Sequence, residues 1–185
     1  CASGRLKAKS PKLVRAIDRL RNQASKDFED EIAQLITEQT GALVRRRIKK
    51  FDRTRMMGPK GEDLGDVDVL AALPDSKLIV AIECKNLALA RTPREIQNQL
   101  VELFKGSRDS SPTTTKHLRR VDWLRSNLSA VLTSLQLSVD EKTWTVVPLL
   151  VSDTEMYGPY LVSPPFPVCS LDTIARTSLV EIVKA

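Results

Sequence analysis

The sequence Gly-Asp-Val-Asp-Val-Leu-Ala-Ala-Leu at residues 65–73 is followed by Pro-Asp-Ser-Lys at 74–77 and by Leu-Ile-Val-Ala-Ile-Glu-Cys-Lys-Asn at 78–86. Two apolar runs rich in strand-forming residues, joined by a short segment with Pro, Asp and Ser, predict an antiparallel β-hairpin. If the last residue of the first run faces the first residue of the second, Asp68 lies opposite Glu83 and Asp66 lies opposite Lys85. Because side chains alternate along a strand, all four charged groups then project from one face.

Two carboxylates held at this spacing need a cation. Directly opposed residues have Cβ atoms about 4.5–5.5 Å apart, and like charges there are destabilising. Residues 78–82 are wholly apolar and predict a buried strand, at whose end Glu83 and Lys85 are costly unless they are paired or bind a ligand. A divalent ion such as Mg²⁺ takes oxygen ligands and keeps waters that can become the nucleophile. Lys85 can activate that water or hold a phosphate as a point charge.

This motif, Gly-Asp-Val-Asp followed by an apolar strand that ends in Glu83-Cys84-Lys85, resembles the PD-(D/E)XK, or restriction-endonuclease-like, nuclease superfamily. The resemblance implies that Asp68 is the first acidic metal ligand and that Glu83 and Lys85 are the (D/E)xK pair. It further implies that the main-chain carbonyl of Cys84 is an additional metal ligand. One departure is that Val67, rather than proline, precedes the first acid. The residues alone also allow a hairpin whose end charges are solvated.

The resemblance adds two candidates on helices. Residues 28–36 resemble the first core helix of the superfamily, whose glutamate leans towards the metal, and Glu29 is the matching residue. Glu31 is the second choice, and both can instead be ordinary acids favoured by the helix dipole. Gln97 occupies the region where some members carry a helix glutamine near the site.

Composition bounds the class of protein. The chain has 185 residues, of which 42% are hydrophobic and 28% are charged, as expected for one globular domain with a real core. No apolar run approaches a membrane span, and no signal-peptide pattern is found. The cysteines are few and unpatterned, which argues against a disulfide framework or zinc site and for a reducing, cytoplasmic compartment. The sequence leaves open whether the chain is a fragment, and whether further domains, other subunits or a second copy complete it.

We expect three segments. Residues 1–26 form a basic arm and a helix that Pro11 opens, residues 27–151 form the nuclease-like core, and residues 152–185 form an extension packed on the core. Residues 1–10 are expected to be disordered. Residues 1–21 carry seven basic side chains and one acid, which accounts for the whole net charge of +6. A basic arm beside a neutral domain indicates a polyanionic partner or a solubilising tail.

Periodicity around the hairpin predicts elements in the order helix, strand, hairpin, helix, strand. This order is that of the α-β-β-β-α-β core of the superfamily, and the resemblance implies an α/β fold with a mixed central sheet flanked by helices. Pro148 predicts an edge or bulge position for the last strand. The expected elements are a helix at 28–39 capped by Ser25 or Asp27 and stopped by Gly41, a strand at 42–51, a helix from Pro93, a helix at about 114–135 and a strand at 143–151.

Several basic side chains are candidates for phosphate contacts. On the strand at 42–51, alternation places Val44 and Ile48 on one face and the basic residues on the other. The basic face either protects an edge strand from aggregation or contacts the phosphates of a nucleic acid. The loop at 52–64 ends beside Asp66 and is expected to touch substrate. If the superfamily topology holds, the start of the helix after Pro93 lies at the active-site end. The candidates for contacts with nucleic acid are Arg45, Arg47, Lys49, Lys60, Arg91 and Arg94.

These expectations describe a nuclease that depends on Mg²⁺, or on Mn²⁺ as a substitute, and hydrolyses phosphodiester bonds of nucleic acid, DNA rather than RNA. In the implied mechanism Asp68 and Glu83 hold the ion, and Lys85 orients or deprotonates the attacking water. The alternative is a catalytically inactive nucleic-acid-binding or assembly module on the same fold. His117, the only histidine, is expected to be solvated rather than catalytic.

Overall fold

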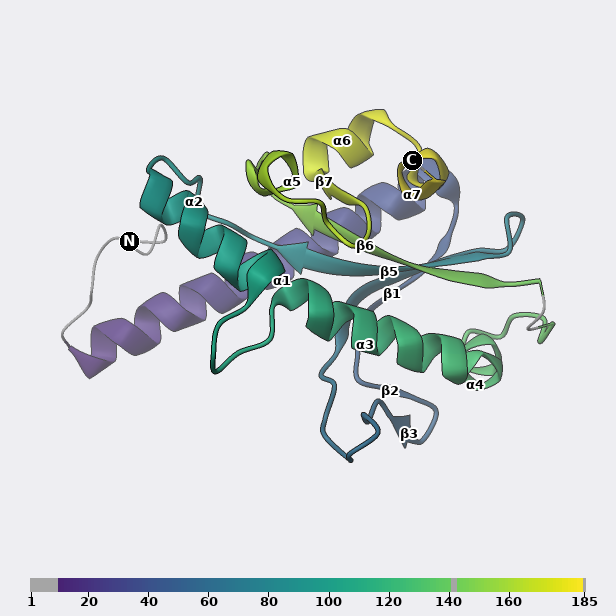
Figure 1. Ribbon diagram of the computed structural model, residues 1–185. Coiled ribbons are helices and arrows are strands. Elements are labelled where there is room, and N and C mark those ends of the chain that lie inside the picture. The colour runs from purple at the N-terminus through teal and green to yellow at the C-terminus, as the bar shows by residue number, and fades with distance from the viewer. Residues whose placement is uncertain (1–9, 141–142, 185) are drawn as a thin grey trace.

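A mixed β-sheet forms the centre of the computed structural model, which describes residues 10–140 and 143–184 (Figure 1). The expected disorder of residues 1–9 lies outside the described residues. Within the described part, the sheet has the strand order β1-β4-β5-β6-β7, where β1 to β5 pair antiparallel and β5 to β7 pair parallel. The predicted mixed α/β architecture is therefore confirmed. The strands are β1 (Leu43–Ile48), β4 (Val67–Leu73), β5 (Leu78–Lys85), β6 (Thr145–Ser152) and β7 (Val168–Ser170).

The hairpin of β4 and β5 has the predicted register. Leu73 pairs with Leu78, and the ladder continues residue by residue to the pair of Val69 and Ile82. Lys77 closes the turn with φ 50° and donates its main-chain N–H to the Pro74 carbonyl at 3.2 Å. Both strands are almost wholly buried, as the apolar runs predict.

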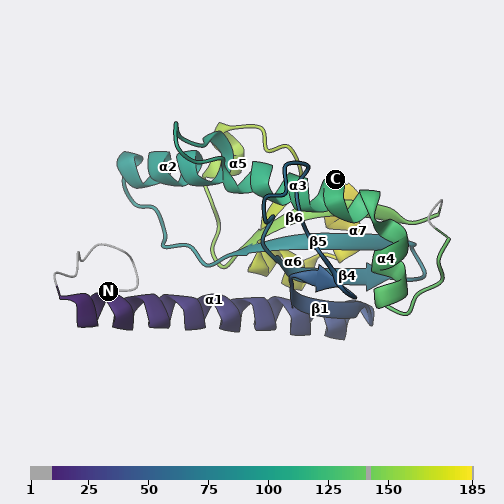
Figure 2. The same cartoon turned by 90° about the horizontal axis from the view of Figure 1, so that it is seen from below.

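Helices cover both faces of the sheet (Figure 2). On one face α1 (Pro11–Thr40), α6 (Leu171–Arg176) and α7 (Leu179–Lys184) pack against Val69, Ala71, Val80 and Ile82. On the other face α3 (Thr113–Ser126) and α4 (Leu128–Ser134) pack against the alternate residues of the same strands, such as Leu70, Ile79 and Ala81. None of the described helices is both long and apolar enough to cross a membrane.

The helix α1 is one continuous helix, so the expected separate start at residue 28 is wrong. Nothing between Pro11 and Thr40 breaks it, and Ser25 and Asp27 lie inside it; Asp27 accepts a hydrogen bond from the Gln23 side chain at 2.7 Å rather than capping an end. The proposed boundary at residues 26 and 27 therefore falls within a helix. Gly41 ends α1 in the left-handed region, with φ 61°, as expected.

The strand expected at 42–51 ends at Ile48 and is kinked at Arg47, which has φ 52°. This residue breaks the alternation of side chains, so Val44 packs on the α1 face and Ile48 on the α3 face rather than together. The chain then forms a short ribbon of β2 (Lys50–Phe51) and β3 (Thr54–Arg55), where a loop was expected from residue 52.

The helix α2 (Pro93–Leu100) starts where it was predicted, with a capping box between Thr92 and Glu95. It continues into a π-helical turn at Val101–Lys105. The helix expected at about 114–135 is divided at Asn127, whose φ of −120° and ψ of 28° separate α3 from α4. The side chain of Asn127 donates to the Trp123 carbonyl at 2.8 Å, a local bond that competes with the helix.

β6 is not an edge strand, yet Pro148 has no sheet neighbour on its outer side. The amides of Thr145 and Asp153 donate to β5, whereas that of Leu150 donates to Pro167 on the other side. By alternation the missing N–H of Pro148 also faces away from β5, and β7 pairs only with residues 150–152. Between β6 and β7 lies the short helix α5 (Gly158–Leu161).

Candidate functional site

Asp68, Glu83 and Lys85 lie together where β4 begins and β5 ends. The main-chain N–H of Cys84 donates to Asp68 Oδ2 at 2.8 Å, which holds this carboxylate against β5. Lys85 Nζ lies 2.9 Å from Glu83 Oε1, and the Glu83 side chain is only 6% exposed. Cys84 packs on the α1 face, opposite Glu83, as predicted. The facing register thus gathers the two carboxylates and the lysine that the sequence motif singled out.

Two side chains of α3 complete this cluster. Arg120 Nη1 donates to Glu83 Oε2 at 2.5 Å, and Arg120 Nε donates to the Leu64 carbonyl at 2.8 Å. His117 is fully buried, with Nε2 at 3.0 Å from the Ala81 carbonyl and Nδ1 at 3.6 Å from Glu83 Oε2. The expectation that His117 is solvated is therefore wrong.

Sequence reasoning missed both residues, although a signal was present. His117 lies four residues before Val121 and seven before Leu124, which is the spacing of the buried face of α3. Arg120, one turn after His117, shares that face at its margin. A charged and a titratable residue on an apolar helical stripe need partners, and Glu83 is the partner that the fold supplies.

The charges in the cluster shift one another. Burial and the nearby charge of Glu83 raise the pKa of Asp68 to about 7. For Glu83, burial raises the pKa, but Lys85, Arg120 and His117 lower it more, so the net shift is downward and the group is ionised. Burial lowers the pKa of Lys85, but the carboxylates of Glu83 and Asp68 raise it more, so Lys85 carries its proton. Burial lowers the pKa of His117 to about 4, which leaves the imidazole neutral.

The carboxylates fit a divalent cation in part. Within the described residues no cation pairs with Asp68, whose burial beside Glu83 leaves a site that a metal ion would neutralise. Glu83 already binds Lys85 and Arg120, yet each carboxylate oxygen has a second lone pair. No group of three or more His, Cys, Asp or Glu side chains suited to a metal is found among the described residues. Mg²⁺ commonly uses one or two carboxylates and keeps waters, so Asp68 and Glu83 are a sufficient protein set.

Glu29 lies on α1, near enough for its charge to raise the pKa of Asp68 slightly. Its carboxylate accepts from Arg47 Nε at 2.5 Å, and Arg47 also binds Asp30, the next residue of α1. The backbone of Arg47 is in the left-handed region, and its side chain is directed towards α1. Arg47 is thus engaged in ion pairs, unlike Arg45 on the same strand, which is exposed. Glu31 is also exposed.

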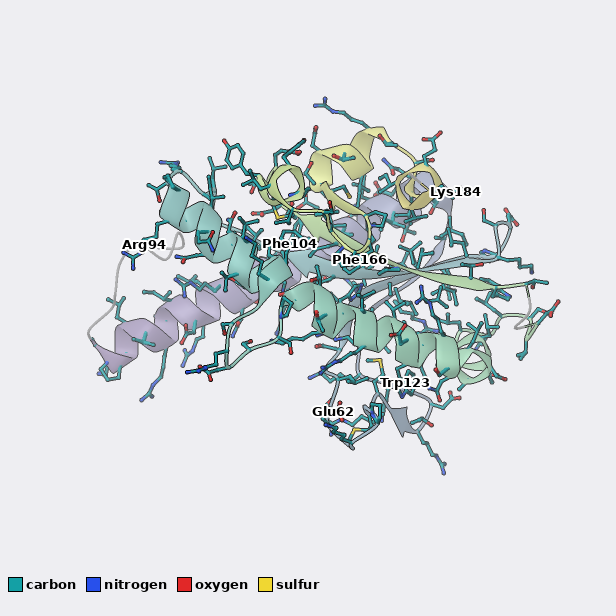
Figure 3. The ribbon with its side chains drawn as sticks, in the orientation of Figure 1. Glu62, Arg94, Phe104, Trp123, Phe166 and Lys184 are labelled. Atoms are coloured by element: carbon teal, nitrogen blue, oxygen red, sulfur yellow. The ribbon has the colours of Figure 1, made fainter. Side chains whose placement is uncertain are left out.

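The remaining candidates lie on the surface outside the cluster. Arg91 and Arg94 lie at the start of α2, and Figure 3 shows Arg94 at the outer end of this helix, whereas Phe104 follows its inner end. The inner end approaches the cluster instead, through Asn98 and Glu102. Gln97 is exposed and points elsewhere, so the expectation that the start of α2 is the active-site end does not match this arrangement. Lys49 and Lys60 are exposed as well.

A pocket of about 570 Å³ opens in front of the cluster. Glu83, Lys85 and Arg120 line it together with the inner end of α2, the segment 106–113 and Lys116 of α3. Asp68 and Glu83 thus lie at the end of the β4–β5 hairpin. β5 and the helix α3, which covers it, also line a polar pocket.

The fold and this cluster define a mixed α/β protein with a buried acidic and basic centre beside a pocket. The family model described as "Anti-phage protein Upx-like" matches residues 3–153, and the chain belongs to this family. No curated protein and no solved structure matches the chain. The matched range contains Asp68, Glu83, Lys85 and Arg120, so the cluster is part of the anti-phage family region. The family indicates a role in defence against phage.

Proposed function

We propose that this chain is a metal-dependent nuclease that hydrolyses phosphodiester bonds of DNA in anti-phage defence. The observation that carries the proposal is the meeting of Asp68, Glu83 and Lys85 at the end of the β4–β5 hairpin, with Asp68 bound to the Cys84 amide and Glu83 bound to Lys85. An unpaired buried carboxylate beside a second one is a costly arrangement for structure alone. It is the arrangement expected where a divalent ion binds.

The order of elements supports the same proposal. A helix, three antiparallel strands, intervening helices and a strand parallel to the third follow one another along α1, β1, β4, β5, α2, α3 and β6. This is the order that the resemblance to the PD-(D/E)XK superfamily implies. Destruction of invading DNA is also a chemistry suited to a member of an anti-phage family.

In the proposed reaction, Asp68 and Glu83 would hold Mg²⁺, which when bound would polarise the phosphate and lower the pKa of a bound water. The water oxygen forms a bond to phosphorus and the water loses a proton to solvent, while the bond from phosphorus to the leaving oxygen breaks and that oxygen takes up a proton from solvent. Lys85 carries its proton, because Glu83 and Asp68 stabilise its charge. Because Lys85 is protonated, it is better suited to orient the water and contact the phosphate than to deprotonate the water.

One observation favours a second candidate, a nucleic-acid-binding module without turnover. Both oxygens of Glu83 are held by cations, Oε1 by Lys85 and Oε2 by Arg120. These two ion pairs compensate the negative charge of Glu83 without any metal, as expected of a cluster that serves only the structure. Asp68 argues the other way, because it forms no ion pair with a described cation and the charge of Lys85 offsets its burial only in part.

Purified protein incubated with plasmid and with linear phage DNA, both double-stranded and heat-denatured, in Mg²⁺, in Mn²⁺ and in EDTA, tests the proposal. We expect hydrolysis in either metal and none in EDTA. Glu83→Gln and Lys85→Met should each lower the rate by orders of magnitude. Glu38→Gln and Lys184→Met, matched changes at exposed positions, should retain it.

Activity retained in Glu83→Gln or in EDTA would remove the hairpin from the mechanism. DNA binding without cleavage in any metal would favour the second candidate. The efficiency of phage plating on cells that express each variant then shows whether hydrolysis and defence are lost together.

A further inference from the structure

The pocket in front of Glu83 and Lys85 is small, and the carboxylate in its wall is buried. Its volume of about 570 Å³ is within the range of small-ligand sites, about 300–1,000 Å³. Glu83 lies in its wall with 6% of its side chain exposed, and Lys85 is 27% exposed. A DNA duplex, whose major groove alone is about 12 Å wide, is too large to enter a space of this size. A phosphate can therefore approach these residues only if its strand enters the pocket by itself.

The wall opposite the sheet is formed by the segment 106–113 and is held in place by its own bonds. The amide of Ser107 donates to the Ser110 carbonyl at 2.9 Å, and Gly106 N–H donates to the Val101 carbonyl at 2.7 Å. Gly106 has φ 74°, and a Cβ there would lie 2.8 Å from Pro112 Cδ, so only glycine fits. Thr114 ties the start of α3 to the Leu103 carbonyl at 2.8 Å. The pocket is thus a defined cavity bounded by a tight turn and two helix ends.

Besides the carboxylates of Glu83 and Glu102, the pocket is lined by hydrogen-bond donors suited to a phosphate and a sugar. Arg120 uses Nε and one N–H of Nη1 for protein partners, and Lys85 uses one of its three N–H groups for Glu83. Lys116 Nζ, on the exposed side, has only a 3.4 Å contact with Ser110 Oγ. The hydroxyl groups that line the pocket belong to Ser107, Ser110, Ser111 and Thr113.

None of the described residues that line the pocket is aromatic. Sites that read unpaired bases stack them on aromatic side chains, so this pocket is suited to the backbone of a strand rather than to its bases. Charged donors beside hydroxyl groups are typical of phosphate contacts that position a nucleic acid without reading its sequence.

We propose that this pocket binds one phosphate and sugar unit of an unpaired nucleic-acid strand, next to the bond that is cut. Lys116 contacts the unit from the exposed side of the pocket, Thr113 contacts it from the buried wall, and Lys85 and Arg120 lie beside Glu83. The inference rests on the proposed nuclease function and narrows its substrate to single-stranded DNA or to DNA that is locally unpaired. Lys116 and Thr113 belong to none of the residues that sequence reasoning selected for phosphate contacts.

Binding measured without metal tests the inference apart from catalysis. The probe is a fluorescein-labelled single-stranded DNA of about 20 nucleotides in EDTA. Its affinity, measured by fluorescence anisotropy, is compared with that of the same sequence as a duplex and as single-stranded RNA. We expect tighter binding of the single-stranded DNA than of the duplex. Lys116→Ala should weaken it about fivefold to tenfold and lower the slope of log K against log salt by about 0.7, the value for one lost phosphate contact on a single strand.

Lys184→Ala is the matched control, because Lys184 is an exposed lysine of α7, on the face of the sheet opposite α3 (Figure 3). Lys184→Ala should change the affinity for single-stranded DNA and the salt slope less than Lys116→Ala does. Thr113→Val, which removes one pocket hydroxyl at nearly constant shape, should weaken binding of the single strand while leaving the salt slope unchanged. Circular dichroism melting of each variant checks that the fold is kept.

Tighter binding of the duplex, or equal effects of Lys116→Ala and Lys184→Ala, would overturn the inference. Tighter binding of the RNA would overturn its assignment to DNA. Single-strand binding that depends on Lys116, in a protein that hydrolyses nothing in Mg²⁺, would support the pocket and overturn the nuclease function instead.

Discussion

The main-chain N–H of Cys84 donates a 2.8 Å hydrogen bond to Asp68 Oδ2, so the carboxylate of one strand is held on the backbone of its neighbour. The bond brings Asp68 beside Glu83, and burial together with this second charge raises the pKa of Asp68 to about 7. Ionised Asp68 therefore costs stability in the metal-free protein, even though its position is well defined.

Asp68→Asn is expected to melt no lower than the parent in EDTA, because the amide oxygen can still accept from Cys84 while one charge is removed. The unfolded chain loses the Asp68 proton near pH 4 and the folded chain near pH 7, so this group destabilises the fold progressively as pH rises between these values. The advantage of the variant should thus be larger at pH 8.5 than at pH 4. Melting curves in EDTA at both pH values measure it.

Mg²⁺ should raise the melting temperature of the parent more than that of Asp68→Asn. A ligand present at a hundred times its Kd stabilises the folded state by about 2.7 kcal/mol, and the variant lacks one proposed ligand. Melting curves of both proteins in EDTA and in excess Mg²⁺ make the comparison. Equal gains in the two proteins would mean that Asp68 does not bind the ion.

Arg120→Met should lower the free energy of unfolding by about 1.5–3 kcal/mol, the range for hydrogen bonds to charged groups. The guanidinium is 13% exposed and joins Glu83 to the Leu64 carbonyl, so its loss leaves both acceptors without a donor. Lys85 still compensates Glu83, which keeps the loss below that of an isolated buried charge. Arg119→Met, at the neighbouring exposed position, should change stability by less than about 0.5 kcal/mol in the same urea titrations. Similar values for both variants would show that the Arg120 contacts contribute no stability.

Arg47→Met should cost about 0.5–1 kcal/mol of stability, as expected for ion pairs near the surface, because Arg47 binds Glu29 and Asp30. Its donors are engaged, so the affinity for single-stranded DNA should stay within twofold of the parent. Arg45→Met, on the same strand and exposed, should leave stability unchanged. Urea titration and anisotropy measure the two properties, and a large loss of DNA affinity in Arg47→Met would show that the arginine leaves its ion pairs to contact phosphate.

Cys169 should resist alkylation by iodoacetamide at pH 8 in the folded protein and react in urea. Burial, together with the charge of Glu155, raises the pKa of its thiol to about 12, and only the thiolate reacts. Burial also raises the pKa of Cys84 well above its usual value, so Cys84 should behave alike. Mass spectrometry of peptides after labelling gives the modified fraction at each cysteine. Rapid labelling of Cys169 under native conditions would contradict this environment.

Local features of the sequence were sufficient for much of the fold. The hairpin register followed from two apolar runs and a short turn, and it brought Asp68, Glu83 and Lys85 together. The helix start at Pro93 and the stop at Gly41 followed from residues whose conformational preferences act at that position. The continuity of α1 was missed because Ser25 and Asp27 resemble caps, although no residue between Pro11 and Thr40 breaks the helix, of which only the part from Phe28 onwards packs on the sheet.

The sequence by itself therefore determined the central hairpin and the acidic pair that the hairpin holds, because these depend on contacts between residues close along the chain. Only the tertiary structure decided what surrounds that pair. Arg120 reaches Glu83 across 37 positions and His117 reaches Ala81 across 36, and both contacts exist because α3 packs its buried face on β5. Arg47 turns to α1 because its backbone leaves the strand conformation. The pocket arises from the same cause, since its walls come from segments that meet only when the helices pack on the sheet.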